Sequence, residues 1–349
     1  MAAASYTRGE MRTLPASQKP RRSGPEGDLL RQLSDRVVGQ PQALHQIVPY
    51  VQMHEAGLAP EGRPVGVFLL LGPTGTGKTK TVEMLAQVLH GSEKHMLKVD
   101  CGEFQMEHEV AKLIGAPPGY LGHRETQPML SQQKLNGVTS DRSSLALVLF
   151  DEIEKAAPSM TRLLLGVLDK ATLRLGDNAT VNFERTIIFL TSNLGADAMR
   201  KQLRPGFGFE TMVDGSRGSL RKLESIGMNA VRRKFSPEFV NRIDAVVTYQ
   251  PLDAGALATI VDQQIEALEK HIENRLMDRA FGIDVTDAAR EFLLRKGTSD
   301  EYGARELKRV ILRNVTQPLA AMVSSGAILP EDVVKIDVDG DGLTLAVSE

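Results

Sequence analysis

The hydrophobic positions of this 349-residue chain form five short apolar runs before residue 250. These runs are 65–71, 95–99, 145–150, 186–190 and 245–249. The run at 145–150 is apolar without a break, which is typical of a parallel strand buried on both faces. More than ten residues separate neighbouring runs, as parallel crossovers require, and a helical pattern at 78–89 follows the first run. The pattern predicts a doubly wound α/β domain at 28–251.

The pattern changes after Pro251. Seven apolar residues recur at helical spacing and form one stripe, namely Leu257, Ile260, Val261, Ile265, Leu268, Ile272 and Leu276. A strand at 282–285, a helix at 288–294, a helix starting near Gly303 and two strands at 333–338 and 343–347 are expected beyond the stripe. The sequence therefore predicts a second, smaller α/β domain at 252–349.

The first 27 residues differ from the rest of the chain. They carry five basic residues and three prolines but few large apolar side chains, so they cannot bury enough surface to fold. We expect a disordered N-terminal tail, with a transit peptide as the alternative; the segment has no apolar core of a secretory signal. Because the chain has one cysteine, Cys101, and no apolar stretch of membrane-spanning length, we expect a cytoplasmic protein without membrane contact.

The charge balance weighs against a nucleic-acid partner. The chain has 42 Lys and Arg against 44 Asp and Glu, whereas nucleic-acid modules usually carry a concentrated basic excess. A local basic patch is still compatible with this total, so a nucleic-acid motor stays among the alternatives.

A glycine-rich segment directly after the first apolar run carries the clearest chemistry. It matches the phosphate-loop pattern G-x-x-x-x-G-K-[ST] with the residues Gly72, Pro73, Thr74, Gly75, Thr76, Gly77, Lys78 and Thr79. The backbone N–H groups of such a loop surround a phosphate, the lysine contacts the β and γ phosphates, and the threonine binds Mg²⁺. A glycine-rich turn with a solvated lysine is the alternative, but a strand before the loop and a helix after it favour an ATP site.

Polar residues follow two later strands. Asp151 and Glu152 end the run at 145–150, and Asn193 comes soon after the run at 186–190. Since open α/β sheets bind ligands at the carboxyl ends of their strands, we expect Asp151 to hold Mg²⁺ together with Thr79 and Glu152 to act as general base. We expect Asn193 to orient the attacking water, although a lone Asn after a strand is more often a helix N-cap.

Several further motifs occur in a familiar order. They are Arg36–Gln40, the phosphate loop, Gly115–Gly122, Asp151–Ala156, Thr191–Gly195, Phe239–Asp244 and Tyr302–Arg305. Together they resemble the second AAA+ module of ClpB-type disaggregases and its Clp unfoldase relatives, with a small C-terminal lid domain. The resemblance covers the chain from about Leu33 onwards. It implies an ATPase that works as a ring, expected to be a hexamer.

The resemblance also implies roles for residues that would otherwise be unremarkable. Val37, Val38 and Gly39 match the segment that packs on the adenine. Arg242 matches the arginine finger that reaches into a neighbouring subunit, and Arg305 matches the sensor arginine of the lid. Without the family, either arginine is more readily explained as a solvated or salt-bridged surface residue.

A glycine-flanked loop suggests the substrate. Tyr120 and Leu121 lie between Gly119 and Gly122, and the resemblance implies that they line the central pore and grip unfolded or tagged client proteins. The simpler interpretation is a tyrosine packed on its own loop. ClpB-type proteins also have an N-terminal domain, a first module and a coiled-coil middle domain, none of which has a match here, so disaggregation that depends on them is in doubt.

Residues 205–209, Pro-Gly-Phe-Gly-Phe, resemble the protease-docking loop of some Clp unfoldases. The match at Phe207–Phe209 is short, and a flexible surface loop explains it as well. The leading hypothesis is an ATP-dependent protein unfoldase that threads polypeptide past Tyr120. An AAA+ nucleic-acid motor and an ATP-gated assembly scaffold are the alternatives, and Glu152 argues against the scaffold because a switch needs no catalytic base.

Overall fold

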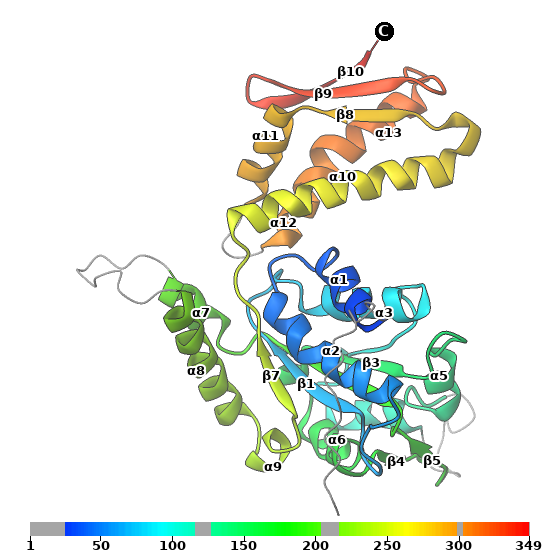
Figure 1. Cartoon of the computed structure of the whole chain (residues 1–349), viewed down its shortest axis with the longest axis vertical. Coiled ribbons are helices and arrows are strands. Elements are labelled where there is room, and N and C mark those ends of the chain that lie inside the picture. Colours follow the sequence, from blue (N-terminus) through cyan, green and yellow to red (C-terminus); the bar gives the residue numbers. More distant parts are fainter. Residues whose placement is uncertain (1–24, 116–126, 204–215, 299–302, 349) are drawn as a thin grey trace, which may run out of the picture.

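A five-stranded sheet forms the centre of the larger part of the molecule in the computed structural model, which describes residues 25–115, 127–203, 216–298 and 303–348 (Figure 1). The strand order is β2-β3-β6-β1-β7, and every neighbouring pair is parallel. The strands are β1 (Gly66–Leu71), β2 (Leu97–Asp100), β3 (Ala146–Asp151), β6 (Thr186–Ser192) and β7 (Ala245–Thr248). The predicted parallel α/β sheet is confirmed.

Successive residues of β1 show how the sheet is covered on both faces. Val67 and Leu69 belong to one buried cluster, whereas Phe68 and Leu70 belong to a second cluster on the other face. The second cluster is closed by α1 (Pro25–Ser34), α2 (Pro41–Glu55) and α3 (Lys78–His90). The first is closed mainly by α6 (Pro158–Lys170), α7 (Ala196–Leu203), α8 (Ser216–Lys234) and α9 (Pro237–Val240). A continuous apolar strand is required because the alternation sends side chains into both cores.

Shorter elements surround the edge of the sheet near β2. They are η1 (Cys101–Glu103), η2 (Glu107–Val110), α4 (Ala111–Ile114), α5 (Gln132–Gly137), η3 (Ile153–Lys155) and the hairpin β4 (Thr172–Arg174) and β5 (Thr180–Asn182). The hairpin was not predicted, because each strand has three residues and only the middle one is buried. Such a strand is too short to show a period of two.

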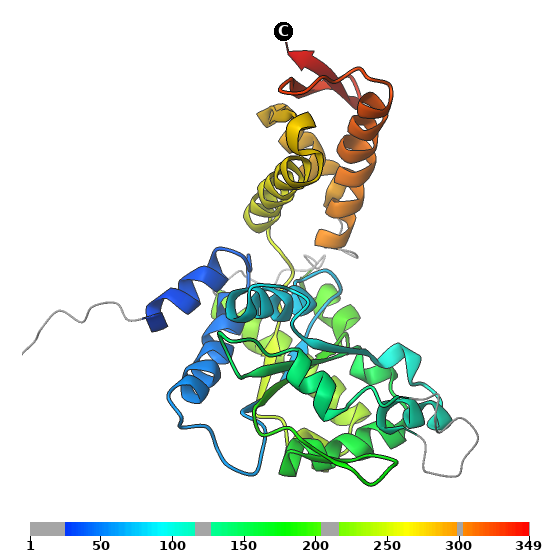
Figure 2. The same cartoon turned by 90° about the vertical axis from the view of Figure 1, so that its right-hand side faces the viewer.

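A smaller α/β unit stands at one end of the larger one (Figures 1 and 2). Its helices are α10 (Ala254–Leu276), α11 (Asp287–Gly297), α12 (Ala304–Ile311) and α13 (Gln317–Ser324), with η4 (Met277–Arg279) after α10 and a π-helical turn, η5 (Leu312–Thr316), between α12 and α13. They pack against a sheet of order β10-β9-β8, made of β8 (Gly282–Val285), β9 (Val333–Asp339) and β10 (Gly342–Ser348). The predicted apolar stripe supplies the core, with Leu257, Val261, Ile265 and Ile272 buried.

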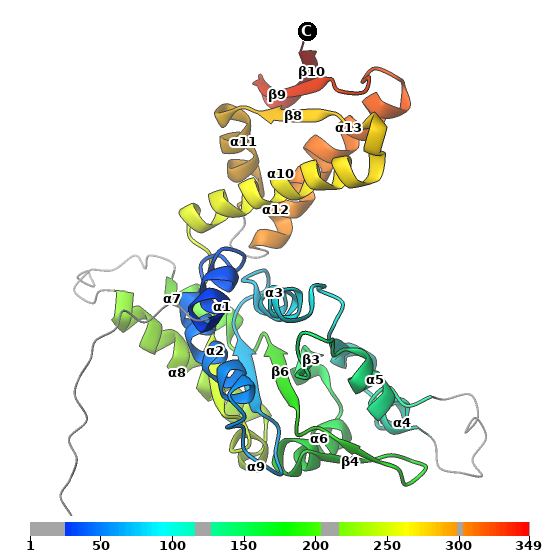
Figure 3. The same cartoon turned by 45° about the vertical axis from the view of Figure 1, so that its right-hand side comes forward.

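The two parts of the chain meet at the carboxyl edge of the large sheet. Figure 3 shows α12 above the end of the large domain that carries α3, and β7 leads into α10 without another element between them.

At the other end of the chain, α1 begins at Pro25, inside the segment expected to be a tail. Within the described parts of the chain, no helix is long and apolar enough to cross a membrane.

Candidate nucleotide site

The phosphate loop connects the end of β1 to the start of α3. Gly77 takes the N-cap position of α3 with a φ of 100°, a left-handed conformation that strongly favours glycine. Gly72, at the other end of the loop, lies so close to β7 that an added Cβ would stand 2.6 Å from the carbonyl oxygen of Tyr249. The two glycines thus meet different needs, since Gly77 allows the turn and Gly72 allows the close approach.

Lys78 is held inside the loop. Its Nζ donates to the carbonyl oxygens of Gly72 at 2.6 Å and Pro73 at 2.8 Å, and to Oδ1 of Asn193 at 2.8 Å. The Thr76 hydroxyl donates to the same Pro73 oxygen at 2.9 Å. Burial disfavours the charged form, so it lowers the pKa of Lys78 to about 8. A phosphate placed in the loop would pair with the lysine and raise this pKa again.

Asp151 is fixed by three side chains. Its Oδ1 accepts from Thr191 Oγ1 at 2.5 Å and from Thr79 Oγ1 at 3.4 Å, and its Oδ2 pairs with Lys98 Nζ at 3.0 Å. Burial acts to raise the pKa of Asp151, but these hydrogen bonds and the charge of Lys98 hold it below its ordinary value. Asp151 is thus ionised at neutral pH beside Thr79. One carboxylate and one hydroxyl, completed by phosphate oxygens and waters, suit Mg²⁺.

Glu152 has an unusual backbone and a well-placed carboxylate. Its φ of 57° lies in the left-handed region, which costs a non-glycine residue about 1–2 kcal/mol. Its N–H donates to Thr191 Oγ1 at 2.9 Å, and its Oε1 accepts from Asn193 Nδ2 at 3.3 Å. Lys155 forms an ion pair with the other carboxylate oxygen. Asn193 therefore bridges Lys78 and Glu152, a contact that was not predicted from the sequence.

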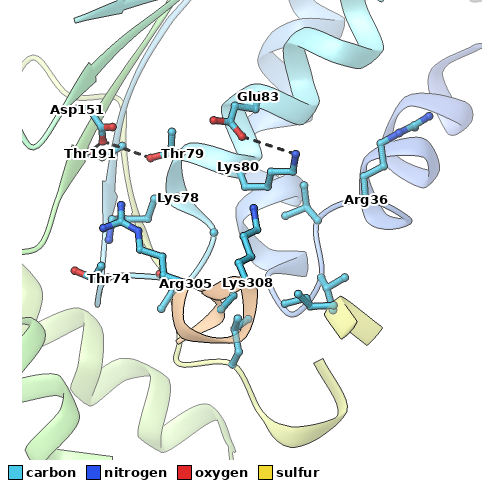
Figure 4. A pocket seen from close by; sticks show the side chains of 18 of the residues that line it. Arg36, Thr74, Lys78, Thr79, Lys80, Glu83, Asp151, Thr191, Arg305 and Lys308 are labelled. Carbon is cyan, nitrogen blue, oxygen red and sulfur yellow. Dashed lines mark hydrogen bonds and ion pairs between the residues drawn. The ribbon is translucent and has the colours of Figure 1, made fainter. Parts of the chain in front are cut away.

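The remaining wall of the site comes from the small domain (Figure 4). Arg305 and Lys308 extend from α12, and Figure 4 shows Arg305 beside Lys78, whose pKa its charge also lowers. The N–H of Ala304, next to Arg305, donates to the carbonyl oxygen of Gly75 at 3.3 Å. The phosphate loop and the small domain are thus in direct contact.

These groups surround a cavity of about 320 Å³, within the range of small-molecule sites. Its lining includes the loop residues Thr74 to Thr79, both acids, Asn193, Arg305, Val37, Val38, Leu252 and Ile260. Gly39 lies behind this wall, where an added Cβ would stand 2.9 Å from a methyl group of Leu252. The apolar part of the lining can pack on a flat base, and the polar part can hold phosphates, so the residues present fit a nucleoside triphosphate with Mg²⁺.

Comparisons with known families agree with this geometry. The family described as AAA domain (Cdc48 subfamily) matches residues 63–246. The chain belongs to the AAA family of ATPases. The C-terminal D2-small domain of ClpB protein matches residues 252–336 of the same AAA chain. The predicted resemblance to the second module of ClpB-type proteins is confirmed.

The chain is similar to two curated relatives and to one solved structure over most of its length. The chaperone protein ClpB of Rhodopseudomonas palustris is 41% identical over 92% of the chain, and that of Corynebacterium efficiens is 38% identical over 91%. The AAA chain spans 34% and 33% of these relatives. An S. cerevisiae Hsp104:casein complex in an extended conformation superposes with a TM-score of 0.78 at 30% identity, covering 95% of this chain and 53% of that one.

Arg242 lies away from the nucleotide cavity of this AAA chain. It precedes β7, which runs parallel to β1, so it stands at the amino edge of the sheet while the phosphate loop stands at the carboxyl edge. The six residues of β1 place these edges about 20 Å apart. Arg242 pairs with Glu238 at 3.2 Å and Asp169 at 3.6 Å. Its role as an arginine finger stays a prediction, one that requires a second AAA subunit.

Two predicted contact segments fall outside the described part of the chain. Tyr120 and Leu121, expected to contact clients, lie in the segment 116–126, and Phe207–Phe209 lies in 204–215. Their roles therefore stay predictions from the sequence.

Two residues of the site were not singled out in advance. Thr191 links Asp151 to the backbone of Glu152, and Lys98 neutralises the outer oxygen of Asp151. Threonine is common in β-strands, so the residue type of Thr191 did not mark it as a site residue. Its position did, because it lies one residue before the end of β6, the neighbour of β3, at the edge where the acids lie. Lys98 is likewise a polar residue near the carboxyl end of β2, the other neighbour of β3.

Proposed function

We propose that this chain is an ATP-driven protein unfoldase that works as a ring, most simply a hexamer. The observation that carries the proposal is the convergence of Lys78, Asp151, Glu152 and Asn193 with Arg305 of the small domain around one cavity. In this proposal residues 28–251 form the ATPase domain and residues 252–349 form its lid. Mg-ATP supplies the transferable phosphoryl group when it is bound.

Each residue has a distinct task in the proposed hydrolysis. Lys78 and the N–H groups of the loop bind the phosphates, while Thr79 and Asp151 hold Mg²⁺. Glu152 takes the proton from the attacking water as general base, and Asn193 orients both that water and the carboxylate to which it donates. Arg305 senses the nucleotide from the lid side.

The position of Arg242 supports the proposal of a ring. A cation at the amino edge of the sheet is about 20 Å from the cavity of its own chain, so it serves catalysis only in a neighbouring subunit. An arginine supplied in trans is worth roughly 10³-fold or more in well-studied phosphoryl-transfer enzymes. We therefore propose that each active site is completed by Arg242 of the adjacent copy.

Extended polypeptide is the proposed substrate. The similar Hsp104 structures are described as complexes with casein, a protein client, and the glycine-flanked Tyr120 and Leu121 of this chain are suited to grip a chain without regard to its sequence. A protease contact through Phe207–Phe209 rests on a very short sequence and does not enter the proposal. Steep, salt-dependent stimulation of the ATPase by DNA would instead favour the nucleic-acid motor.

The test separates hydrolysis from mechanical work. Glu152→Gln should retain nucleotide binding and lose at least about 100-fold in kcat, because the general base is removed. Tyr120→Ala should keep ATP turnover but lose the unfolding of a tagged fluorescent protein, and Tyr120→Phe, which keeps the ring, should restore unfolding. Equal loss of turnover and unfolding in Tyr120→Ala would refute the proposed role of the loop, and an inactive wild-type protein would refute the ATPase.

A further inference from the structure

A third acid follows Asp151 and Glu152 at the end of β3. Glu154 lies in η3, the single helical turn that comes after the strand. Its Oε1 accepts a hydrogen bond from the backbone N–H of Asn193 at 3.0 Å. Its Oε2 is shielded from solvent and accepts no hydrogen bond from any residue that the structure describes. Glu154 thus faces the loop after β6 rather than water.

Glu154 contacts Asn193, the residue that links Lys78 to Glu152. The amide of Asn193 accepts from Lys78 Nζ at 2.8 Å and donates to Glu152 Oε1 at 3.3 Å. Both contacts come from one planar group, so a rotation or shift of the backbone at residue 193 would disturb them together. Asn193 follows the last residue of β6, where ladder hydrogen bonds no longer hold the chain. A fixed acceptor at this N–H therefore controls the geometry of the amide.

We propose that Glu154 is a positioning residue that holds Asn193 in register with Lys78 and Glu152. The inference rests on the proposed ATP hydrolysis and adds one more side chain to the residues that support it. Glu154 touches neither substrate nor metal and acts through Asn193. A hydrogen bond to an ionised acceptor is stronger than one to a neutral group, which explains the use of a carboxylate at this place.

Two substitutions separate the hydrogen bond from the charge. Glu154→Ala removes both, so kcat for ATP should fall at least about tenfold while KM changes by less than about threefold. Glu154→Gln keeps an acceptor oxygen for the Asn193 N–H, so kcat at pH 7 should recover to within about threefold of wild type. Glu266→Gln, which removes an exposed carboxylate paired with Lys270 on α10, is the matched control and should leave both parameters unchanged.

Thermal unfolding monitors the fold of each variant. If Glu154→Ala does not fold, Glu154→Met, which keeps the length of the side chain but has no acceptor oxygen, takes its place, and a kcat within twofold of wild type overturns the proposal. A folded Glu154→Ala with kcat within twofold of wild type overturns it as well. These results are distinct from a failure of the proposed function, in which the wild-type protein itself would show no Mg-dependent ATP hydrolysis and no binding of a fluorescent ATP analogue.

Discussion

Thr191→Val is the most direct probe of how the acids of this site are held. The Thr191 side chain is buried at the end of β6, and its hydroxyl donates to Asp151 Oδ1 at 2.5 Å while it accepts from the N–H of Glu152 at 2.9 Å. Valine has nearly the same shape but can make neither bond. The substitution therefore removes two hydrogen bonds without opening a cavity, and Thr191→Ser, which keeps the hydroxyl, is its control.

The magnitude follows from the groups left without partners. A partly buried N–H that loses its acceptor costs about 1–3 kcal/mol, and the left-handed backbone of Glu152 loses one of the contacts that hold it. For a domain of this size the melting temperature should fall by about 2–4 °C for each kcal/mol. Relaxation of Glu152 moves its carboxylate, and a displacement of about 1 Å at a catalytic group can cost 100-fold in rate. We expect kcat to fall about 10- to 100-fold.

Steady-state ATP hydrolysis at saturating Mg²⁺ and thermal unfolding of the nucleotide-free protein measure the two effects separately. Loss of the Thr191 hydrogen bond should also let the Asp151 carboxylate turn away from Thr79, so more Mg²⁺ should be needed for half-maximal activity. Thr191→Ser should be close to wild type in all three measurements. A Thr191→Val protein with wild-type kcat would refute the reasoning, since the hydroxyl would then have no part in placing Glu152.

Two further predictions concern the phosphate loop. The pKa of Lys78 is about 8 in the folded protein and about 10.5 in the unfolded chain, so the unfolded state binds more protons between these two pH values. The contribution of the lysine to the free energy of unfolding should therefore rise by roughly 2 kcal/mol from pH 7.5 to 9.5. The difference between wild type and Lys78→Met in urea unfolding isolates this rise, and nucleotide affinity should fall over the same range; a flat difference would contradict the burial argument. Gly72→Ala should destabilise the protein by about 2 kcal/mol more than Gly57→Ala, since both have positive φ but only Gly72 faces a carbonyl oxygen at 2.6 Å. Equal melting temperatures would show that Tyr249 yields to the added methyl group.

The strands of the large sheet were predictable because their burial on both faces leaves a continuous apolar run. The run at 145–150 corresponds to β3 with a shift of one residue, and the strand expected at 282–285 coincides with β8. The residues at the carboxyl edge followed from the same rule, since each strand end delivers its next polar residue to that edge. Asp151, Glu152 and Asn193 were found in this way.

Side-chain partners across the edge could not be predicted. Lys155 follows Glu152 by three residues and is an ordinary charged residue of a short turn in the sequence, yet it pairs with the carboxylate expected to act as base. Lys98 comes from a strand more than fifty residues before Asp151. These contacts depend on strand order and on side-chain rotamers, neither of which leaves a local pattern. The position of Arg242 at the opposite edge likewise depends on where β7 enters the sheet.

The length of α10 would convert a small rotation at the nucleotide cavity into a larger displacement at the far end of the small domain. Ile260, Gln263 and Gln264, in the first half of this helix, line the nucleotide cavity, and the helix continues to Leu276. The part beyond Gln264 extends about 18 Å, so a rotation of about 10° at the cavity would carry the far end by about 3 Å. The helix is packed along one side into the small core, so the two would rotate together. In the proposed unfoldase, a change of a single phosphate group in the cavity would thereby become a displacement of about one residue of extended polypeptide.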